Sequence, residues 1–323
     1  MGVSGMCSIS CALTLGWTTT VALIGADAFV PPALQQRTPP TTRMMMTTTD
    51  RDHHSSTPEE TTPTHRVVFL RHGESTWNRD DRHIGWTDVP LTERGEHEAL
   101  LAGRALRKEG FEFDVVFASV LKRVLKTEHI VMDELDQLWV PEIKDYRLNE
   151  RHYGDCIGKT KSEAEEAFGK ENVALWASSY DVAPLPMSTD GLYYPKDDRR
   201  YQHVVDENGA CAIPRTECMK DVSRRVVGYW EEEIAPVVRS GKRVLVAGHA
   251  NMLKTLLQHL DGIPDDVIVA MKVPRATPIV YDLGADLKPL RSPLPDTLLS
   301  AELLSVDGAP ARMAAADGEV NAF

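Results

Sequence analysis

The side chains best suited to chemistry in this sequence are two arginines and two histidines that follow short apolar runs. They are Arg71, His72, Arg123 and His249. Apolar runs of this length are typical of buried strands, and ligands of parallel sheets bind where the strands end. We therefore expect the four side chains to converge. Two imidazoles, two guanidinium groups and nearby backbone N–H donors suit an anionic group that an imidazole attacks.

The chemistry that fits this set is the transfer of a phosphoryl group through a histidine. An imidazole nitrogen can accept the group as a nucleophile, which divides one difficult transfer into two easier ones. Arginine binds the phosphoryl oxygens in a bidentate fork. A carboxylic acid must protonate the departing alkoxide, and burial prepares it for this task if it raises the pKa. The best candidate for that acid is Glu150.

Several of these residues could also have a purely structural role. Glu150 could form a solvated surface ion pair with Arg147 or Arg151, as most neighbouring Glu and Arg residues do. His249 could be a core histidine whose nitrogens bond to the backbone, and Arg123 could be an exposed charge on a helix. Burial at one common edge of the fold would separate the chemical role from these alternatives.

The order of apolar and amphipathic segments predicts an α/β fold. Short apolar runs alternate with longer segments of helical periodicity, which is typical of a three-layer sandwich with a mostly parallel sheet flanked by helices. We expect strands at 66–70, 115–118, 140–144, 244–247 and 279–283, and helices at 92–108, 121–135, 161–168, 218–238 and 251–260. Residues 177–214 are rich in Pro, Asp, Gly and Ser, so we expect a long lid insertion there.

Three motifs in order resemble a known family. They are Leu-Arg-His-Gly-Glu-Ser-Thr-Trp-Asn at 70–78, Gly-Trp-Thr-Asp-Val-Pro-Leu-Thr-Glu-Arg-Gly at 85–95 and Arg-Leu-Asn-Glu-Arg-His-Tyr-Gly-Asp at 147–155. Together they look like the cofactor-dependent phosphoglycerate mutases of the histidine phosphatase superfamily, over residues 65–290. A bare Arg-His-Gly is weak evidence, whereas several ordered motifs indicate a family more firmly than a substrate.

The resemblance implies a role for each matching residue. It makes His72 the phosphorylated nucleophile and Glu150 the general acid and base. The pocket of the transferred phosphoryl group would consist of Arg71, Asn78, Arg123 and His249. The rest of the substrate would contact Ser75, Gly85, Arg151, Tyr153, Lys161 and Asn251. The family needs no metal, is primed by 2,3-bisphosphoglycerate and forms dimers or tetramers, so we expect a homodimer or homotetramer without a catalytic metal.

The chain departs from the family in the part that contacts the rest of the substrate. The family has Thr where this chain has Ile84, an Arg-Arg pair where it has Ala177 and Ser178, and Gly where it has Ala250. Loss of a bidentate arginine would weaken a phosphate contact by about 1.5–3 kcal/mol, which is about one to two decades in affinity. The substrate is therefore less constrained by the sequence than the phosphohistidine chemistry.

Three functions remain open. The leading one is a phosphoglycerate mutase, an isomerase of glycolysis and gluconeogenesis that interconverts 3-phosphoglycerate and 2-phosphoglycerate. A histidine-type phosphatase on a small phosphorylated metabolite would use the same nucleophile, and water would complete its reaction. A catalytically poor homologue would only bind a phosphorylated ligand, but such a protein needs neither a nucleophile nor a proton donor. The net charge of −12 and the pI of about 5.4 argue against nucleic acid and a membrane surface as partners.

Composition divides the chain into three parts. We expect a targeting leader and linker at 1–64, a phosphoglycerate mutase-like catalytic domain at 65–290 and a C-terminal tail at 291–323. Five cysteines are scattered without Cys-x-x-Cys spacing, so they suggest neither a disulfide framework nor a zinc site.

The leader has the features of a targeting segment. Residues 1–26 carry no charge, Ala26-Asp27-Ala28 fits a signal-peptide cleavage site, and residues 29–49 contain no acidic side chain. This order resembles the bipartite leaders that direct proteins to plastids. We therefore expect a disordered transit peptide, a plastid location and no membrane association of the mature chain. The alternatives are another organelle, the cytoplasm or an ordinary disordered tail.

Overall fold

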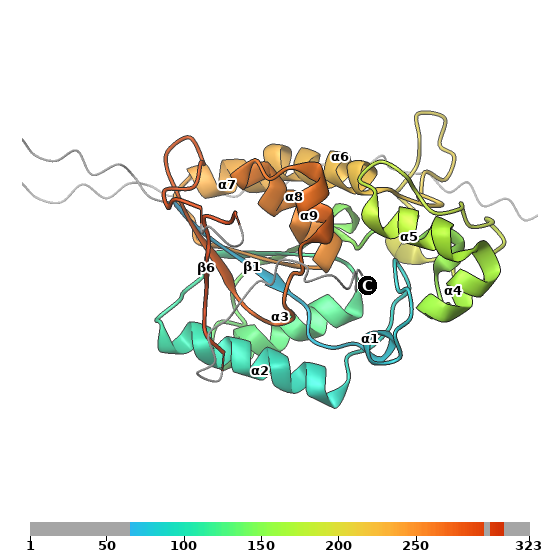
Figure 1. Ribbon diagram of the computed structural model, residues 1–323. Helices are drawn as coiled ribbons and strands as arrows, with labels where there is room; N and C mark the ends of the chain where they lie inside the picture. The colour runs from blue at the N-terminus through green and yellow to red at the C-terminus, as the bar shows by residue number, and fades with distance from the viewer. Residues whose placement is uncertain (1–64, 294–297, 307–323) are drawn as a thin grey trace, which may run out of the picture. The chain divides into compact units, whose positions relative to one another are not determined.

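A six-stranded sheet forms the centre of the domain in the computed structural model, which describes residues 65–293 and 298–306 (Figure 1). The strands are β1 (His65–Arg71), β2 (Val115–Ala118), β3 (Glu142–Lys144), β4 (Val244–Gly248), β5 (Ile279–Leu283) and β6 (Glu302–Leu303). Their order is β3-β2-β4-β1-β5-β6. The first four in that order run parallel, whereas β5 is antiparallel to both β1 and β6.

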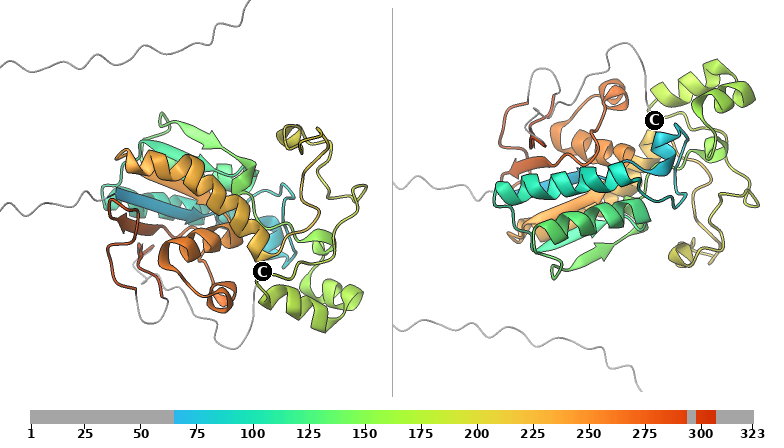
Figure 2. Two further views of the ribbon diagram at one scale, coloured as in Figure 1. Left: turned by 90° about the horizontal axis from the view of Figure 1, so that it is seen from above. Right: turned by 90° about the horizontal axis from the view of Figure 1, so that it is seen from below.

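Helices cover both faces of the sheet, so the predicted α/β fold with a mostly parallel sheet flanked by helices is confirmed. They are α1 (Thr76–Arg79), α2 (Glu93–Lys108), α3 (Lys122–Glu134), α4 (Lys161–Phe168), α5 (Lys170–Ser178), α6 (Met219–Tyr229), α7 (Ala235–Arg239), α8 (Ala250–Asp261) and α9 (Asp265–Ala270). Helices α2 and α3 pack on one face, and α6, α7 and α8 pack on the other (Figure 2).

The central strands are apolar at successive positions because both faces of the sheet are covered. Along β1, Val67 and Phe69 pack against α6, α7 and α8, whereas Val68 and Leu70 pack against α2 and α3. This alternation fixes the register of β1, since a slip of one residue would exchange the two faces. The chain therefore leaves the sheet at a defined point, with His72 at the carboxyl edge.

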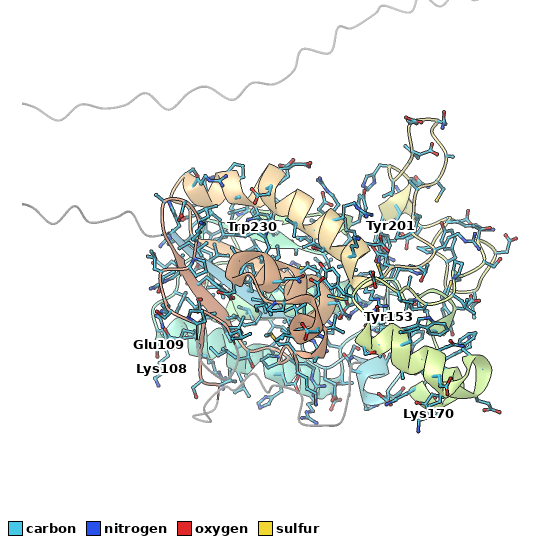
Figure 3. The ribbon with its side chains drawn as sticks, turned by 45° about the horizontal axis from the view of Figure 1, so that its top comes forward. Lys108, Glu109, Tyr153, Lys170, Tyr201 and Trp230 are labelled. Carbon is cyan, nitrogen blue, oxygen red and sulfur yellow. The ribbon has the colours of Figure 1, made fainter. Side chains whose placement is uncertain are left out.

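The predicted lid insertion, between α5 and α6, contains a 3₁₀ turn and otherwise irregular chain. It packs in a small core together with residues of α4, α5 and the second and third sequence motifs, in which the ring of Tyr201 lies 5.1 Å from that of Trp86. Figure 3 shows Tyr153 and Tyr201 at one end of the domain and Lys108 and Glu109 at the other. The insertion thus lies at the same end of the domain as the second and third sequence motifs, which contain Trp86 and Tyr153.

Two predicted elements differ from the structure for reasons that involve proline. The strand predicted at 140–144 begins only at Glu142, because Pro141 has no N–H to donate to the sheet. The helix predicted at 218–238 is divided by a π-helical turn at Trp230–Ile234. Pro236 cannot donate to the carbonyl four residues earlier, and a wider turn accommodates this missing hydrogen bond.

Short elements were missed by the sequence prediction. Helices α1, α5 and α9 were not predicted, and neither was β6, which lies in the expected tail and pairs with β5. The predicted leader lies outside the described residues. Among the residues that the structure describes, the helices are too short or too polar to cross a bilayer.

Candidate active site

The predicted nucleophile, His72, lies at the point where β1 leaves the sheet. Its backbone N–H donates to the carbonyl of Gly248 at the end of β4, so the two strand ends are adjacent. The side chain is 3% exposed, and its Nδ1 lies 2.7 Å from the carbonyl oxygen of Gly73. A carbonyl can only accept, so Nδ1 carries the proton and the lone pair is on Nε2. His72 is thereby prepared to attack through Nε2.

The electrostatic surroundings of His72 favour its neutral, nucleophilic form. Burial lowers its pKa well below the usual histidine range, and the nearby charges of Arg123 and Arg71 lower it further. A protonated imidazole would have no lone pair at Nε2. The positive surroundings therefore keep the nucleophile free and at the same time attract an anionic substrate.

Gly73 is required because two backbone segments touch. A Cβ atom at this position would lie 2.2 Å from the carbonyl oxygen of Gly95, which is a backbone atom and cannot rotate away. The N–H of Gly73 donates to Thr127 Oγ1 at 3.1 Å. The glycines of the first and second motifs thus bring the loop after β1 against the start of α2 and fix the position of His72.

The second histidine, His249, follows β4 and forms the N-cap of α8. Its ring centroid lies 5.1 Å from that of His72 in an edge-to-face arrangement. His249 is fully buried, and its Nε2 lies 2.8 Å from Ser119 Oγ, whereas its Nδ1 has no hydrogen-bond partner among the described residues. Burial, then Arg123 and His72, lower its pKa well below the usual range. The structural alternative required hydrogen bonds from the ring nitrogens of His249 to the backbone, and neither nitrogen makes one among the described residues.

Each of the two predicted arginines donates to the backbone through terminal nitrogens and has an Nε–H that is not used in this way. Arg123 is fully buried, and its two terminal nitrogens donate to the carbonyls of Gly85 and Thr87 at 2.9 and 2.8 Å. Arg71 donates to the carbonyl of Val273 at 2.7 Å. In both residues Nε is buried without a hydrogen-bond partner among the described residues. Burial lowers the pKa of both, to about 10 for Arg123.

Buried guanidinium donors without acceptors need a partner, since an unpaired buried N–H costs roughly 1–3 kcal/mol. An anionic group at this edge would supply acceptors for both Nε–H groups and for a ring nitrogen of His249. The two cations also have little nearby negative charge to neutralise them, apart from Glu150 and more distant carboxylates. This arrangement has the chemistry of a phosphoryl-binding pocket.

The predicted acid, Glu150, is 8% exposed and lies beside α8. Its Oε1 accepts from the backbone N–H of Arg151 at 2.7 Å and of Asn251 at 3.3 Å. The alternative partner Arg147 pairs instead with Asp145 and Glu232, and the guanidinium of Arg151 donates to backbone carbonyls. Glu150 therefore does not form the solvated surface ion pair that was its structural alternative.

Most of the remaining predicted site residues form two groups of contacting side chains. Ser75 and Asn78 form a capping box at α1, in which Asn78 Oδ1 accepts from the hydroxyl of Ser75 at 2.8 Å. Asn251 Nδ2 donates to the hydroxyl of Tyr153 at 2.6 Å, and the Arg151 guanidinium lies 5.4 Å from the centre of the Tyr153 ring. Lys161 is partly buried in the first turn of α4, and Gly85 has a φ of 54° that favours glycine.

The positions that differ from the family lie beside these groups. Ile84 is 7% exposed and is adjacent to the carbonyl of Gly85 that holds Arg123. Ala177 and Ser178 end α5, and the Ser178 hydroxyl donates to the carbonyl of Ala174 within the helix. None of the three supplies a cation to a substrate.

The sequence interpretation missed two cations near the site. Arg275 precedes β5, contributes to the low pKa of His72, and pairs with Glu98 and Glu74 at 3.4 and 3.6 Å. Lys254 is buried in α8, and burial lowers its pKa to about 8. A lysine between leucines on the buried face of an amphipathic helix was a signal that could have found it.

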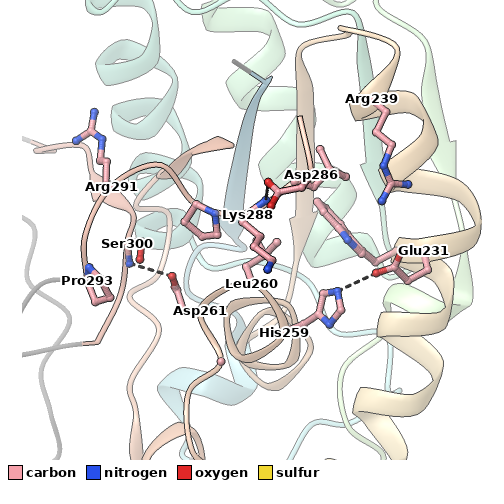
Figure 4. Close-up of a pocket in the computed structure, with 14 residues that line it drawn as sticks. Glu231, Arg239, His259, Leu260, Asp261, Asp286, Lys288, Arg291, Pro293 and Ser300 are labelled. Carbon is pink, nitrogen blue, oxygen red and sulfur yellow. Dashed lines mark hydrogen bonds and ion pairs between the residues drawn. The ribbon is translucent and has the colours of Figure 1, made fainter. Parts of the chain in front are cut away.

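A second cavity, of about 540 Å³, lies at the far end of α8 from His249 (Figure 4). Two of its ionisable side chains have partners within the lining: His259 pairs with Glu231 at 2.9 Å, and Asp261 accepts from the N–H of Ser300. This cavity lacks the buried nucleophile and unpaired donors of the first site. The chemistry therefore belongs to the carboxyl edge of the sheet.

Comparisons with known proteins agree with this geometry. Residues 67–208 match the family model of the histidine phosphatase superfamily (branch 1). YhfR of Bacillus stearothermophilus is 25% identical with a TM-score of 0.51, and the match covers 68% of this chain and 91% of that protein. The alpha-ribazole phosphatase of Shigella flexneri and a mycobacterial glucosyl-3-phosphoglycerate phosphatase are 23% and 21% identical, with TM-scores of 0.52 and 0.53, each covering 70% of this chain and 94% of its own. Residues 67–208 of the chain thus resemble the histidine phosphatase superfamily (branch 1).

Proposed function

We propose that this chain is a phosphoglycerate mutase that interconverts 3-phosphoglycerate and 2-phosphoglycerate through a phosphohistidine on His72. The observation that carries the proposal is the ring of His72, whose Nδ1 faces the carbonyl of Gly73, beside Arg71 and Arg123, each with a buried Nε that lacks a hydrogen-bond partner among the described residues. This set combines a nucleophile with anion donors that are already in place, so catalysis needs little rearrangement.

The first half of the reaction loads the histidine. His72 Nε2 attacks the phosphorus atom, an N–P bond forms, and the bond from phosphorus to the substrate oxygen breaks. The carbonyl of Gly73 keeps the proton on Nδ1 and stabilises the positive ring. Arg71, Arg123 and Nδ1 of His249 would hold the three phosphoryl oxygens during the transfer.

Glu150 would carry the proton in both halves of the reaction. Both of its backbone hydrogen bonds go to Oε1, which leaves Oε2 to exchange the proton. The protonated carboxyl gives its proton to the departing alkoxide, and in the second half the carboxylate removes a proton from the hydroxyl that attacks the phosphohistidine. The N–P bond then breaks, and His72 returns to its neutral form.

The expected primer, 2,3-bisphosphoglycerate, fits the same donors through one of its phosphoryl groups. When bound, it would supply the phosphoryl group that loads the enzyme. Arg71, Arg123 and His249 would hold that group, because their buried donors lack acceptors. Its second phosphoryl group would meet Arg151 and Lys161 but no cation at Ala177 or Ser178.

A phosphatase on a small phosphorylated metabolite is the second candidate, and the outer half of the site favours it. Mutase action requires the bisphosphorylated intermediate to stay bound while it turns. Ile84, Ala177 and Ser178 supply no charge for this purpose. If the acceptor leaves the outer half before the second transfer, the phosphohistidine stays loaded and water takes its phosphoryl group, which releases free phosphate.

One experiment separates these candidates. The purified protein is incubated with 3-phosphoglycerate, with and without catalytic 2,3-bisphosphoglycerate, and both 2-phosphoglycerate and free phosphate are measured. Primer-dependent isomerisation without phosphate supports the mutase, phosphate release supports the phosphatase, and neither product refutes both. His72→Ala should abolish turnover, whereas His97→Ala, which changes an exposed histidine on α2, should not. Retained turnover in His72→Ala would refute the phosphohistidine mechanism.

Two further expectations accompany this proposal. We propose that residues 1–64 direct the chain to a plastid, which a fluorescent fusion of that segment would test. We also propose a homodimer or homotetramer, which light scattering of the purified protein would test.

A further inference from the structure

A cluster of two carboxylates and one imidazole lies where α3 meets the edge strand β3 (Figure 2). Glu128 and His129 come from the middle of α3, and Glu142 begins β3. One ligand atom from each residue can be chosen so that all three lie within 4.8 Å of one another. None of the three belongs to the phosphohistidine site, and the proposed reaction uses none of them.

Glu128 is the unusual member of the cluster. Its side chain is 4% exposed, and its Oε2 is buried without a hydrogen-bond partner among the described residues. Nε2 of His129 lies 3.4 Å from this oxygen. Glu142 likewise has one buried oxygen, Oε1, without a hydrogen-bond partner, and its Oε2 lies 3.5 Å from the same Nε2. Oε2 of both carboxylates therefore faces one imidazole, and each carboxylate has one buried oxygen without a hydrogen-bond partner among the described residues.

Such an arrangement is costly without a cation. Buried carboxylates are normally hydrogen-bonded, paired or bound to metal. Two carboxylates this close, one of them buried, repel each other when both are charged. Lys144 compensates only part of this charge: its ammonium lies 2.6 Å from Glu142 Oε2, on the exposed side of the cluster. Among the described residues, Glu128 has no ammonium or guanidinium group in ion-pair contact.

We propose that Glu128, His129 and Glu142 bind a divalent first-row transition cation, of which Zn²⁺ is the representative. An imidazole with two carboxylates is a mixed nitrogen and oxygen set that suits Zn²⁺ better than Mg²⁺ or Ca²⁺, which prefer oxygen ligands. Because His129 is exposed, water completes the coordination. The flexible side chain of Lys144 moves into solvent when the cation takes its place.

The cation joins two elements that lead into the active site. Helix α3 carries Arg123 in its first turn, and Glu128 follows one and a half turns later. Strand β3 is followed directly by the segment that contains Glu150. A cation between α3 and β3 therefore fixes the spacing of the elements that carry the phosphoryl-binding arginine and the acid. It acts as a positioning site, and it touches no reacting atom.

The test is titration of the full-length, chelator-treated protein with Zn²⁺, and in parallel with Mg²⁺, by calorimetry and thermal unfolding. The expected result is one Zn²⁺ site whose occupation raises Tm and a much weaker response to Mg²⁺. His129→Gln and Glu142→Gln should each weaken that site by more than about tenfold, since even changes beyond the ligands have effects of this size. His97→Gln, at an exposed histidine on the neighbouring helix α2, is the matched control and should bind as the wild type does.

Lys144→Met distinguishes a cation site from a simple ion-pair cluster. Removal of the competing ammonium should tighten Zn²⁺ binding, whereas it should only destabilise the fold if Lys144 is the natural partner of both carboxylates. Glu128→Gln should abolish the site, and the circular dichroism spectrum reports whether that variant folds. If His129→Gln and Glu142→Gln bind Zn²⁺ as tightly as the control does, or if Zn²⁺ leaves Tm unchanged, the proposal is wrong.

Discussion

Arg123→Lys is the sharpest test of the phosphoryl-binding pocket. In the native protein both terminal nitrogens of this guanidinium bind backbone carbonyls at 2.8 and 2.9 Å, and Nε–H remains unpaired. A lysine ammonium keeps the charge and fits the same space. It cannot reproduce the planar fork that holds two carbonyls and still directs a third donor elsewhere.

The expected effect of Arg123→Lys has two separable parts. Loss of one charge-assisted hydrogen bond to a buried carbonyl would lower the free energy of unfolding by about 1.5–3 kcal/mol. Loss of the Nε–H donor to the transferring phosphoryl group would cost a similar amount in the transition state. That corresponds to a decrease in kcat/KM of about 10- to 150-fold.

Urea unfolding measures the loss of stability. Steady-state kinetics with saturating 2,3-bisphosphoglycerate measure the decrease in kcat/KM independently. Arg104→Lys is the matched control, because that arginine is 60% exposed on α2 and lies 3.5 Å from Glu134. The control should change neither quantity appreciably. If folded Arg123→Lys retains kcat/KM within about twofold of the wild type, the guanidinium does not bind the phosphoryl group and the assignment of this pocket is wrong.

Four further predictions address other parts of the site. Gly73→Ala places a Cβ 2.2 Å from the carbonyl oxygen of Gly95, so we expect it to destabilise the fold by at least about 1–3 kcal/mol in urea unfolding; an unchanged midpoint would contradict the contact. The pKa of His72 is lowered, so its ring should still be neutral at pH 6.5 in ¹⁵N NMR spectra, and an ordinary titration midpoint would contradict the assignment. Burial lowers the pKa of His152 to about 4, so the folded state resists its protonation. The stability that depends on neutral His152 is complete above pH 6.5 and decreases toward pH 4; about 2 kcal/mol should be lost between pH 7 and pH 5, and His152→Gln should remove most of that loss. Ala177→Arg should lower the KM for 3-phosphoglycerate and the share of free phosphate among the products, and it would count against our interpretation of the outer half if both stayed constant.

The sequence predicted the sheet well because its central strands are buried on both faces. Continuous apolar runs such as 115–118 and 279–283 are too short for a core helix and typical of a buried strand, and the structure has strands with these bounds. Elements whose stability comes from tertiary packing were missed. Helix α5 begins with a polar segment after Gly169, and β6 has only two residues, so neither has a periodic pattern long enough to recognise.

The candidate site was predictable where it follows strand ends and was not predictable where it depends on packing. His72 and His249 lie at adjacent strand ends, as the rule for parallel sheets requires. The same rule did not find Arg275, because β5 is antiparallel and therefore starts, rather than ends, at this edge. The proximity of Glu128 to Glu142 depends on how α3 packs beside β3, which no local pattern encodes.

The distribution of charge explains why the site constrains the phosphoryl chemistry more than it constrains the rest of the substrate. The chain has a net charge of −12, so a phosphorylated acid approaches against an unfavourable field and depends on local cations. In the phosphoryl half, Arg71 is partly buried and Arg123 is fully buried, and each has a buried Nε–H without a partner among the described residues, which suits one anionic group. In the proposed outer half, Ile84, Ala177 and Ser178 contribute no charge, so we expect discrimination there to depend on Arg151, Tyr153 and Lys161. In the proposed mechanism the same phosphohistidine serves a mutase or a phosphatase, and the residence time of the phosphorylated acid in the outer half while His72 is loaded decides between them.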